Sequence, residues 1–272
     1  MTASVPELQE PGTGTARGPA LITGGTRGIG LAVAESLAAR GYPVVVCARD
    51  ADAVRQTVKE LTERGHRADG VVCDVTSTAS VRAFVETAVD RFGPVEVLVN
   101  NAGRSGGGVT SQLDESLWQD VIDTNLTSVF LVTKEVLTTG GMTARGHGRI
   151  ISIASTGGKQ GVAFGAPYSA SKHGVVGFTK ALGLELAKSG ITVNAVCPGY
   201  VETPMAGNVR QHYANIWDIP EEEVLRRFEA KIPLGRYTQP REVAALVEYL
   251  VTDAAAAVTA QALNVCGGLG NY

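Results

Sequence analysis

The tyrosine and the lysine of the segment Tyr168-Ser169-Ala170-Ser171-Lys172 are suited by type and spacing to acid–base chemistry. On a helix, residues four apart lie on the same face, so the phenol and the ammonium group point into one space. A phenol has a pKa of about 10, and a nearby cation stabilises its phenolate. Because such a pair is also common on surface helices, its meaning depends on its surroundings.

Two further polar residues occur where this chemistry would use them. Ser155 directly follows an apolar run, Arg149–Ala154, that is typical of a buried strand. Its hydroxyl would therefore lie at the carboxyl end of a strand, where open α/β sheets bind ligands. Asn125 lies within a predicted helix, Glu115–Thr139, where an asparagine is unfavourable unless its amide has a polar task.

The elements that must position these residues alternate regularly from Pro19 onward. Short runs rich in Val, Ile and Leu predict strands at Ala20–Thr23, Val44–Ala48, Gly70–Asp74, Val95–Asn100, Arg149–Ala154, Thr192–Cys197 and Ala262–Val265. Longer segments predict helices at Gly28–Arg40, Asp52–Arg64, Ser80–Phe92, Glu115–Thr139, Pro167–Lys188 and Pro240–Val251. This order predicts a doubly wound α/β fold, a parallel sheet of about seven strands with helices on both faces.

The alternation continues to the end of the chain, so we expect a single domain over residues 19–272. Residues 1–18 contain Pro, Gly and Thr but no apolar stretch, and we expect a disordered tail there. One segment interrupts the pattern, at residues 199–234, with Tyr213, Trp217 and an acidic run. An insertion after a late strand would cap the open end of the sheet, so we expect it to form a lid.

A glycine-rich turn follows the first predicted strand and leads directly into a helix. It reads Thr23-Gly24-Gly25-Thr26-Arg27-Gly28-Ile29-Gly30. Glycines at such a turn let backbone N–H groups approach a pyrophosphate, and the helix N-terminus favours negative charge. The alternative is a tight turn with no ligand. The position between a strand and a helix favours a nucleotide site of the Rossmann type.

The motif Thr-Gly-x-x-x-Gly-x-Gly resembles that of the short-chain dehydrogenase/reductase family, and the resemblance extends over residues 19–272. Asn125, Ser155, Tyr168 and Lys172 match the family's tetrad in order and surroundings. The resemblance implies that Tyr168 donates a proton and that Ser155 holds the carbonyl oxygen. It further implies that Lys172 contacts the nicotinamide ribose and lowers the pKa of Tyr168, and that Asn125 orders a water.

The end of the second strand indicates NADP(H) as the cofactor. Members that use NAD carry a carboxylate there, and this chain has Ala48 followed by Arg49. Arg27 and Arg49 are suited to a phosphate. Asp50 lies where an acidic residue would favour NAD, but we interpret it as a helix N-cap. The resemblance adds further cofactor contacts, with turn formation as the alternative for the first five: Asp74, Val75, Asn101, Ala102, Gly103, Pro198, Gly199, Val201 and Thr203.

Three segments, 101–108, 155–162 and 264–272, closely resemble the family's aromatic polyketide ketoreductases, which act on substrates carried by an acyl carrier protein. That resemblance implies a substrate pocket lined by Ser105, Gly106, Gly107, Ser155, Gln160, Val162, Tyr168, Met205 and Tyr213. Arg49 and Arg104 are candidates to meet the carrier protein, with a solvated loop charge as the alternative for Arg104. Ser105 replaces a proline of that group and relaxes the loop, so a relative from another aromatic pathway is expected.

Two other functions stay open, a fatty-acid-type 3-oxoacyl carrier-protein reductase and a non-catalytic NADP-binding regulator. The intact tetrad counts against the regulator. The formal charge of −3, from 24 basic and 27 acidic residues, argues against nucleic-acid or membrane binding. The four cysteines and four histidines are scattered, which predicts reduced thiols and no metal site. We expect a cytoplasmic enzyme, and the family resemblance implies a homotetramer.

Overall fold

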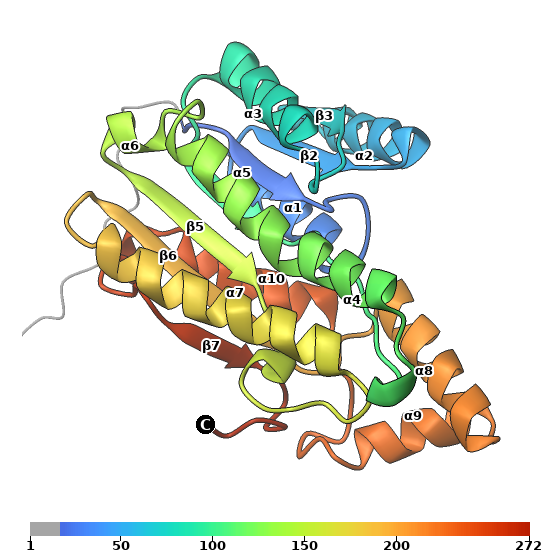
Figure 1. Cartoon of the computed structure of the whole chain (residues 1–272). Helices are drawn as coiled ribbons and strands as arrows, with labels where there is room; N and C mark the ends of the chain where they lie inside the picture. Colours follow the sequence, from blue (N-terminus) through green and yellow to red (C-terminus); the bar gives the residue numbers. More distant parts are fainter. Residues whose placement is uncertain (1–16) are drawn as a thin grey trace, which may run out of the picture.

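A computed structural model describes residues 17–272 of the chain and contains one seven-stranded, fully parallel sheet (Figure 1). The strand order is β3-β2-β1-β4-β5-β6-β7. Most of the predicted tail, residues 1–16, lies outside the described residues. The main-chain N–H of Gly18 donates a hydrogen bond of 2.7 Å to the carboxylate of Glu96, which directly precedes a strand of the sheet.

Every predicted strand and helix is present, with boundaries shifted by a few residues, and the helices Met142–Arg145, Pro204–Trp217 and Glu221–Glu229 were not predicted. The strands are β1 Ala20–Thr23, β2 Val44–Ala48, β3 Ala68–Val72, β4 Val97–Asn100, β5 Gly148–Ile153, β6 Ile191–Pro198 and β7 Ala262–Val265. The helices are α1 Gly28–Ala39, α2 Ala51–Glu63, α3 Thr78–Phe92, α4 Glu115–Ile122, α5 Ser128–Leu137, α6 Met142–Arg145, α7 Ala166–Glu185, α8 Pro204–Trp217, α9 Glu221–Glu229 and α10 Pro240–Leu250.

Successive side chains along the strands point to opposite faces of the sheet, and they contribute to one apolar layer on each face. On one face, Ile22 and Val46 belong to a cluster with residues of α1 and α10. On the other, Leu21, Val45 and Phe84 belong to a cluster with residues of α3, α5 and α7. Helices therefore cover both faces, and the predicted doubly wound fold is confirmed.

The strand order reverses between β1 and β4, which are neighbours in the sheet. In open α/β sheets this reversal leaves a crevice outside the carboxyl ends of the strands, and ligands bind there. Thr23 ends β1 and Asn100 ends β4, so the residues that follow them border this crevice.

The predicted helix Glu115–Thr139 is not a regular α-helix along its length. A π-helical turn at Asp123–Thr127 separates α4 from α5, and α5 ends at Leu137. Asn125 lies in this turn and is fully buried. A π turn widens the helix locally, and it lets the amide of Asn125 reach partners outside the helix.

Helices α8 and α9 form the segment that interrupts the sequence pattern. They lie beyond the carboxyl end of β5 (Figure 1). Ala214, Val224, Phe228, Ile232 and Tyr237 form a small apolar cluster of their own there. Arg210 of α8 ties this unit together, because its guanidinium donates to both Glu202 and Glu221 at 2.9–3.0 Å.

Candidate functional site: a dinucleotide crevice and a buried Tyr–Lys pair

The turn between β1 and α1 has glycines at positions where a larger residue would be strained or would clash. Gly24 has a φ of +62°, a left-handed conformation that glycine adopts without strain. A Cβ on Gly30 would lie 2.2 Å from the carbonyl oxygen of Gly24, so only glycine fits there. The N-cap of α1, Arg27, makes no side-chain capping bond, and the first turn contains no acidic residue. Its N–H groups are therefore suited to an anionic ligand.

The segment after β4 is fastened to this turn by side-chain hydrogen bonds. Thr23 Oγ1 accepts from the main-chain N–H groups of Asn101 and Ala102, both at 2.9 Å. The side-chain amide of Asn101 donates to the carbonyl oxygens of Thr23 and Gly24 at 2.9 and 3.0 Å. Thr23, Asn101 and Ala102 thus hold two strand ends together as one rigid edge of the crevice.

At the end of β2, Asp50 caps α2, as the sequence analysis predicts. Its carboxylate accepts from the N–H groups of Asp52 and Ala53 at 2.9 and 3.1 Å. Arg27 and Arg49 are exposed. Asp74 accepts hydrogen bonds from the N–H and hydroxyl of Thr76, which lower the pKa of its carboxyl group, and Arg49 contributes more weakly. This end of the crevice therefore has two exposed cations, Arg27 and Arg49, and the carboxylate of Asp50 is engaged in a helix cap.

The last cofactor residues predicted from the sequence lie around the end of β6 and the start of α8. Pro198 ends β6, Gly199 follows it, and Val201 is buried and bridges to Thr238. Thr203 caps α8 by accepting from the N–H of Ala206 at 3.3 Å. A Cβ on Gly28 would lie 3.2 Å from the Thr203 methyl group, so the glycine turn and this segment meet. The remaining predicted cofactor residues are half-buried or buried beside these turns: Thr26, Ile29, Val75 and Gly103.

Lys172 lies on α7 and is buried, with 6% of the residue exposed. Its Nζ donates a hydrogen bond of 2.8 Å to the main-chain oxygen of Ile153, the last residue of β5. It also lies 5.9 Å from the centre of the Tyr168 ring. Burial disfavours the charged form and lowers the pKa of Lys172 to about 8.

Ser155 and Tyr168 come together from the segment after β5 and from α7. Burial raises the pKa of Tyr168, and a hydrogen bond with Ser155 opposes this rise. The net direction of the Tyr168 pKa is therefore upward, whereas the family resemblance implies a lowering by Lys172. Ser155 also begins a 3₁₀ turn, Thr156–Gly158, where its Oγ accepts from the N–H of Gly157 at 3.0 Å.

Asn125 completes the group by linking two neighbouring segments. Its Oδ1 accepts from the N–H of Arg104 at 2.8 Å, and its amide donates to the Arg104 carbonyl at 3.0 Å. The same amide donates to the Ser171 hydroxyl at 3.1 Å. Asn125 thus joins the segment after β4 to the helix that carries Tyr168 and Lys172.

The predicted substrate residues fall into two sets. In the first set, each residue closely contacts a neighbouring segment of the chain. This set comprises Gly106, Gly107, Val162 and Tyr213. A Cβ on Gly106 would lie 2.4 Å from Val121, and one on Gly107 would lie 2.0 Å from the Phe164 oxygen. The Tyr213 hydroxyl donates to the Ala163 oxygen at 3.2 Å. Ser105, Gln160 and Met205 have no side-chain hydrogen bond among residues 17–272, and Gln160 and Met205 are exposed.

Arg104 is not a free loop charge. Its guanidinium forms an ion pair with Asp120 of α4, and its Nε donates to the Ser105 oxygen at 3.2 Å. Both side chains are exposed by roughly half, so the pair lies at the protein surface.

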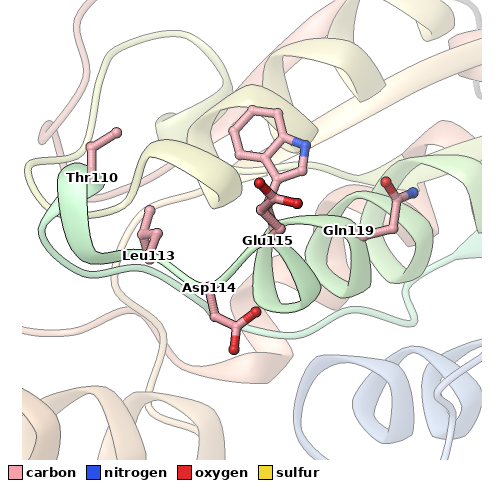
Figure 2. Close-up of a pocket in the computed structure, with 6 residues that line it drawn as sticks. Thr110, Leu113, Asp114, Glu115 and Gln119 are labelled. Carbon is pink, nitrogen blue, oxygen red and sulfur yellow. The ribbon is translucent and has the colours of Figure 1, made fainter.

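A separate hollow of about 360 Å³ lies at the start of α4. Thr110, Leu113, Asp114, Glu115, Trp118 and Gln119 line it (Figure 2). None of the predicted site residues is among them. Over residues 17–272 no helix is long and apolar enough to span a membrane. The same residues contain no group of three or more His, Cys, Asp or Glu side chains placed to hold a metal ion.

The fold and this arrangement define a class of protein. The chain belongs to the short chain dehydrogenase family, whose sequence pattern matches residues 19–214. Family membership was expected from the glycine motif and the tetrad, and it is confirmed.

Within that family, relatives from polyketide biosynthesis match almost the whole chain. A protein of Streptomyces violaceoruber, named as ketoacyl reductase 1 of the granaticin polyketide synthase, is 65% identical over 271 residues, which are 100% of this chain and 99% of the relative. The crystal structure of a variant of actinorhodin polyketide ketoreductase with NADPH superposes with a TM-score of 0.92 at 63% identity, covering 94% of this chain and 98% of that one. A 3-oxoacyl-acyl-carrier-protein reductase of Vibrio cholerae is 39% identical over 92% of this chain and 96% of its own length.

Some residues of this site were not predicted from the sequence. Ile153 supplies only a main-chain oxygen, and Asp120 is one of many acidic residues on helices. Ser171 had a signal, because it lies between Tyr168 and Lys172 in the segment that carries the chemistry.

Proposed function

We propose that this chain is an NADPH-dependent ketoreductase. It reduces one ketone of an aromatic polyketide, carried on an acyl carrier protein, to a secondary alcohol in antibiotic biosynthesis. The observation that carries the proposal is the convergence of Ser155, Tyr168 and Lys172 at the carboxyl end of β5, in a chain 65% identical to a polyketide synthase ketoacyl reductase.

The crevice fits NADPH. The glycine turn at Gly24 and Gly30 leaves room for a pyrophosphate, and the uncapped N–H groups of α1 are suited to bind it. Arg27 and Arg49 would hold the 2′-phosphate, and Lys172 the nicotinamide ribose. When bound, the nicotinamide supplies the hydride.

The side chains of the protein manage the proton. A raised pKa keeps Tyr168 in its neutral form, which is the form that donates a proton to the carbonyl oxygen. Ser155 donates a hydrogen bond to the same oxygen and orients the ketone. The cationic Lys172 then stabilises the phenolate left behind.

The substrate enters beneath the lid, residues 199–234. The candidate residues that line its path are Ser105, Gly106, Gly107, Gln160, Val162, Met205 and Tyr213. The phosphopantetheine arm of the carrier protein brings the polyketide to this mouth, where Arg49 and Arg104 are the candidate contacts for the carrier. Arg104 is paired with Asp120, and Arg49 cannot be assigned wholly to both the carrier and the 2′-phosphate.

Substrate preference tests the proposal. The purified protein is given NADPH with either a bicyclic ketone such as a decalone or a linear acetoacetyl thioester, and NADPH consumption is followed by absorbance. We expect a higher kcat/KM for the bicyclic ketone. A strong preference for the linear thioester would instead indicate a fatty-acid-type 3-oxoacyl reductase.

We also propose that the enzyme is a cytoplasmic homotetramer. Phe130 of α5 and Leu184 of α7 are exposed apolar side chains on helices of one face, which suits contacts between subunits. All four cysteines are free, as is usual in a reducing compartment. Sedimentation of the purified protein measures the subunit number.

A further inference from the structure

The turn that begins with Ser155 is held from outside by the last residues of the chain. We call residues 155–159 the Ser155 turn. Its last residue, Lys159, places Nζ 3.2 Å from the Ala262 oxygen, 3.0 Å from Asn264 Oδ1 and 2.9 Å from the main-chain oxygen of Tyr272. An ammonium group has three N–H donors, so all three have protein acceptors. Lys159 is therefore not available to bind substrate.

Tyr272 also binds the first part of the same turn, at Thr156. Its hydroxyl donates to the Thr156 oxygen at 3.3 Å, and its ring lies 5.1 Å from Lys159 Nζ. Asn264 of β7 supports this arrangement by donating to the Gly270 oxygen at 2.9 Å. A Cβ on Gly270 would lie 2.7 Å from the Tyr272 hydroxyl, so glycine leaves the space that this ring occupies.

The opposite side of the Ser155 turn packs against α7, the helix that carries Tyr168 and Lys172. A Cβ on Gly158 would lie 2.5 Å from the main-chain oxygen of Lys172, and one on Gly157 would lie 3.3 Å from the Tyr168 ring. The turn is thus confined between α7 on one side and, on the other, Ala262, Asn264 and Tyr272, which bind it through Lys159 and Thr156. A shift of Lys159 would move Ser155 relative to Tyr168.

We propose that Lys159 and Tyr272 are positioning residues that set the place of the Ser155 hydroxyl relative to Tyr168. The proposal rests on the function proposed above. Neither residue touches the reacting atoms, and both act through the Ser155 turn. Lys159 donates hydrogen bonds to residues more than a hundred positions away in the sequence, so this support forms only when the distant segments have folded together.

The test combines Lys159→Met with Ser155→Ala in the full-length chain. Lys159→Met keeps the length of the side chain and removes its three donors, and we expect kcat to fall about tenfold with the Kd of NADPH within about twofold of wild type. Lys159→Arg keeps a cation and should restore part of kcat. Tyr272→Phe removes only one hydrogen bond and should cost about threefold. Lys188→Met, at an exposed lysine near the end of α7, is the matched control and should leave kcat unchanged.

A positioning role predicts that the two losses do not multiply. Once Ser155 is alanine, adding Lys159→Met should lower kcat no further, because the hydroxyl that it positions is gone. Losses that multiply, or an unchanged kcat in Lys159→Met, would overturn the proposal.

Hydrogen exchange gives a measurement that needs no turnover. Lys159→Met should speed amide exchange in the Ser155 turn relative to Lys188→Met, and unchanged exchange there also overturns the proposal. If wild type reduces no ketone, the proposed function fails, whereas the exchange experiment still decides whether Lys159 holds the turn.

Discussion

The ammonium group of Lys172 and the main-chain oxygen of Ile153 form a 2.8 Å hydrogen bond that joins the middle of α7 to the end of β5. Ser155 follows Ile153 by two residues, and Tyr168 precedes Lys172 by one helical turn. This bond therefore joins the strand that leads to the serine and the helix that carries the tyrosine. It also keeps a cation inside the protein, where its pKa falls to about 8.

Lys172→Met should abolish turnover and change how stability depends on pH. A buried lysine with a lowered pKa binds its proton less tightly in the folded state than in the unfolded state. Between pH 8 and the ordinary lysine value of 10.5, the unfolded state therefore binds more protons, and wild-type stability rises with pH. Below pH 8 both states are protonated and this contribution is constant.

The free energy of unfolding of Lys172→Met, relative to wild type, should thus decline between pH 8 and 10 by up to about 1.4 kcal/mol per pH unit. Urea unfolding at several pH values measures it. A difference that stays flat over this range would show that Lys172 titrates normally.

Tyr168→Phe should remove turnover while leaving NADPH binding within about twofold of wild type, because only the proton donor is lost. NADPH fluorescence gives the binding and absorbance gives the rate. Tyr249→Phe, at an exposed tyrosine of α10, is the control for a lost hydroxyl. Appreciable activity in Tyr168→Phe would refute the proton-donor role.

Arg49→Asp should shift the cofactor preference from NADPH toward NADH by about tenfold or more in the ratio of kcat/KM values, because a carboxylate repels the 2′-phosphate. Arg55→Asp, an exposed site on α2, makes the same charge change away from the crevice. A wild type that prefers NADH, or an unchanged ratio in Arg49→Asp, contradicts the assignment.

Asn125→Ala should lower the free energy of unfolding by about 2–4 kcal/mol, because it leaves the main-chain groups of half-buried Arg104 and the hydroxyl of buried Ser171 without this partner. Urea unfolding measures the change. Asn215→Ala, at an exposed site on α8, should cost no more than about 0.5 kcal/mol. A loss below about 1 kcal/mol for Asn125→Ala would mean that these bonds contribute little to stability.

Gly107→Ala should displace the segment at Phe164, because its new methyl group would lie 2.0 Å from the Phe164 oxygen. We expect kcat/KM for a bicyclic ketone to fall by about tenfold or more. Gly161→Ala is the matched control, since a Cβ there meets nothing within 4 Å. Equal activity in the two variants would place Gly107 outside the substrate path.

The local sequence determined much of this protein. Alternating apolar runs and amphipathic segments predicted the doubly wound sheet, and the glycine turn, the Asp50 cap and family membership could be recognised from neighbouring residues. These features depend on side-chain periodicity and on backbone conformations that a few adjacent residues impose.

Other properties of the site were decided only by the tertiary structure. The π turn at Asn125, the lowered pKa of Lys172 and the raised pKa of Tyr168 follow from burial and from partners on other elements. The support of the Ser155 turn by Tyr272 likewise joins residues 116 positions apart. Because burial and hydrogen-bond partners are set by how distant elements pack, no local pattern in the sequence encodes them.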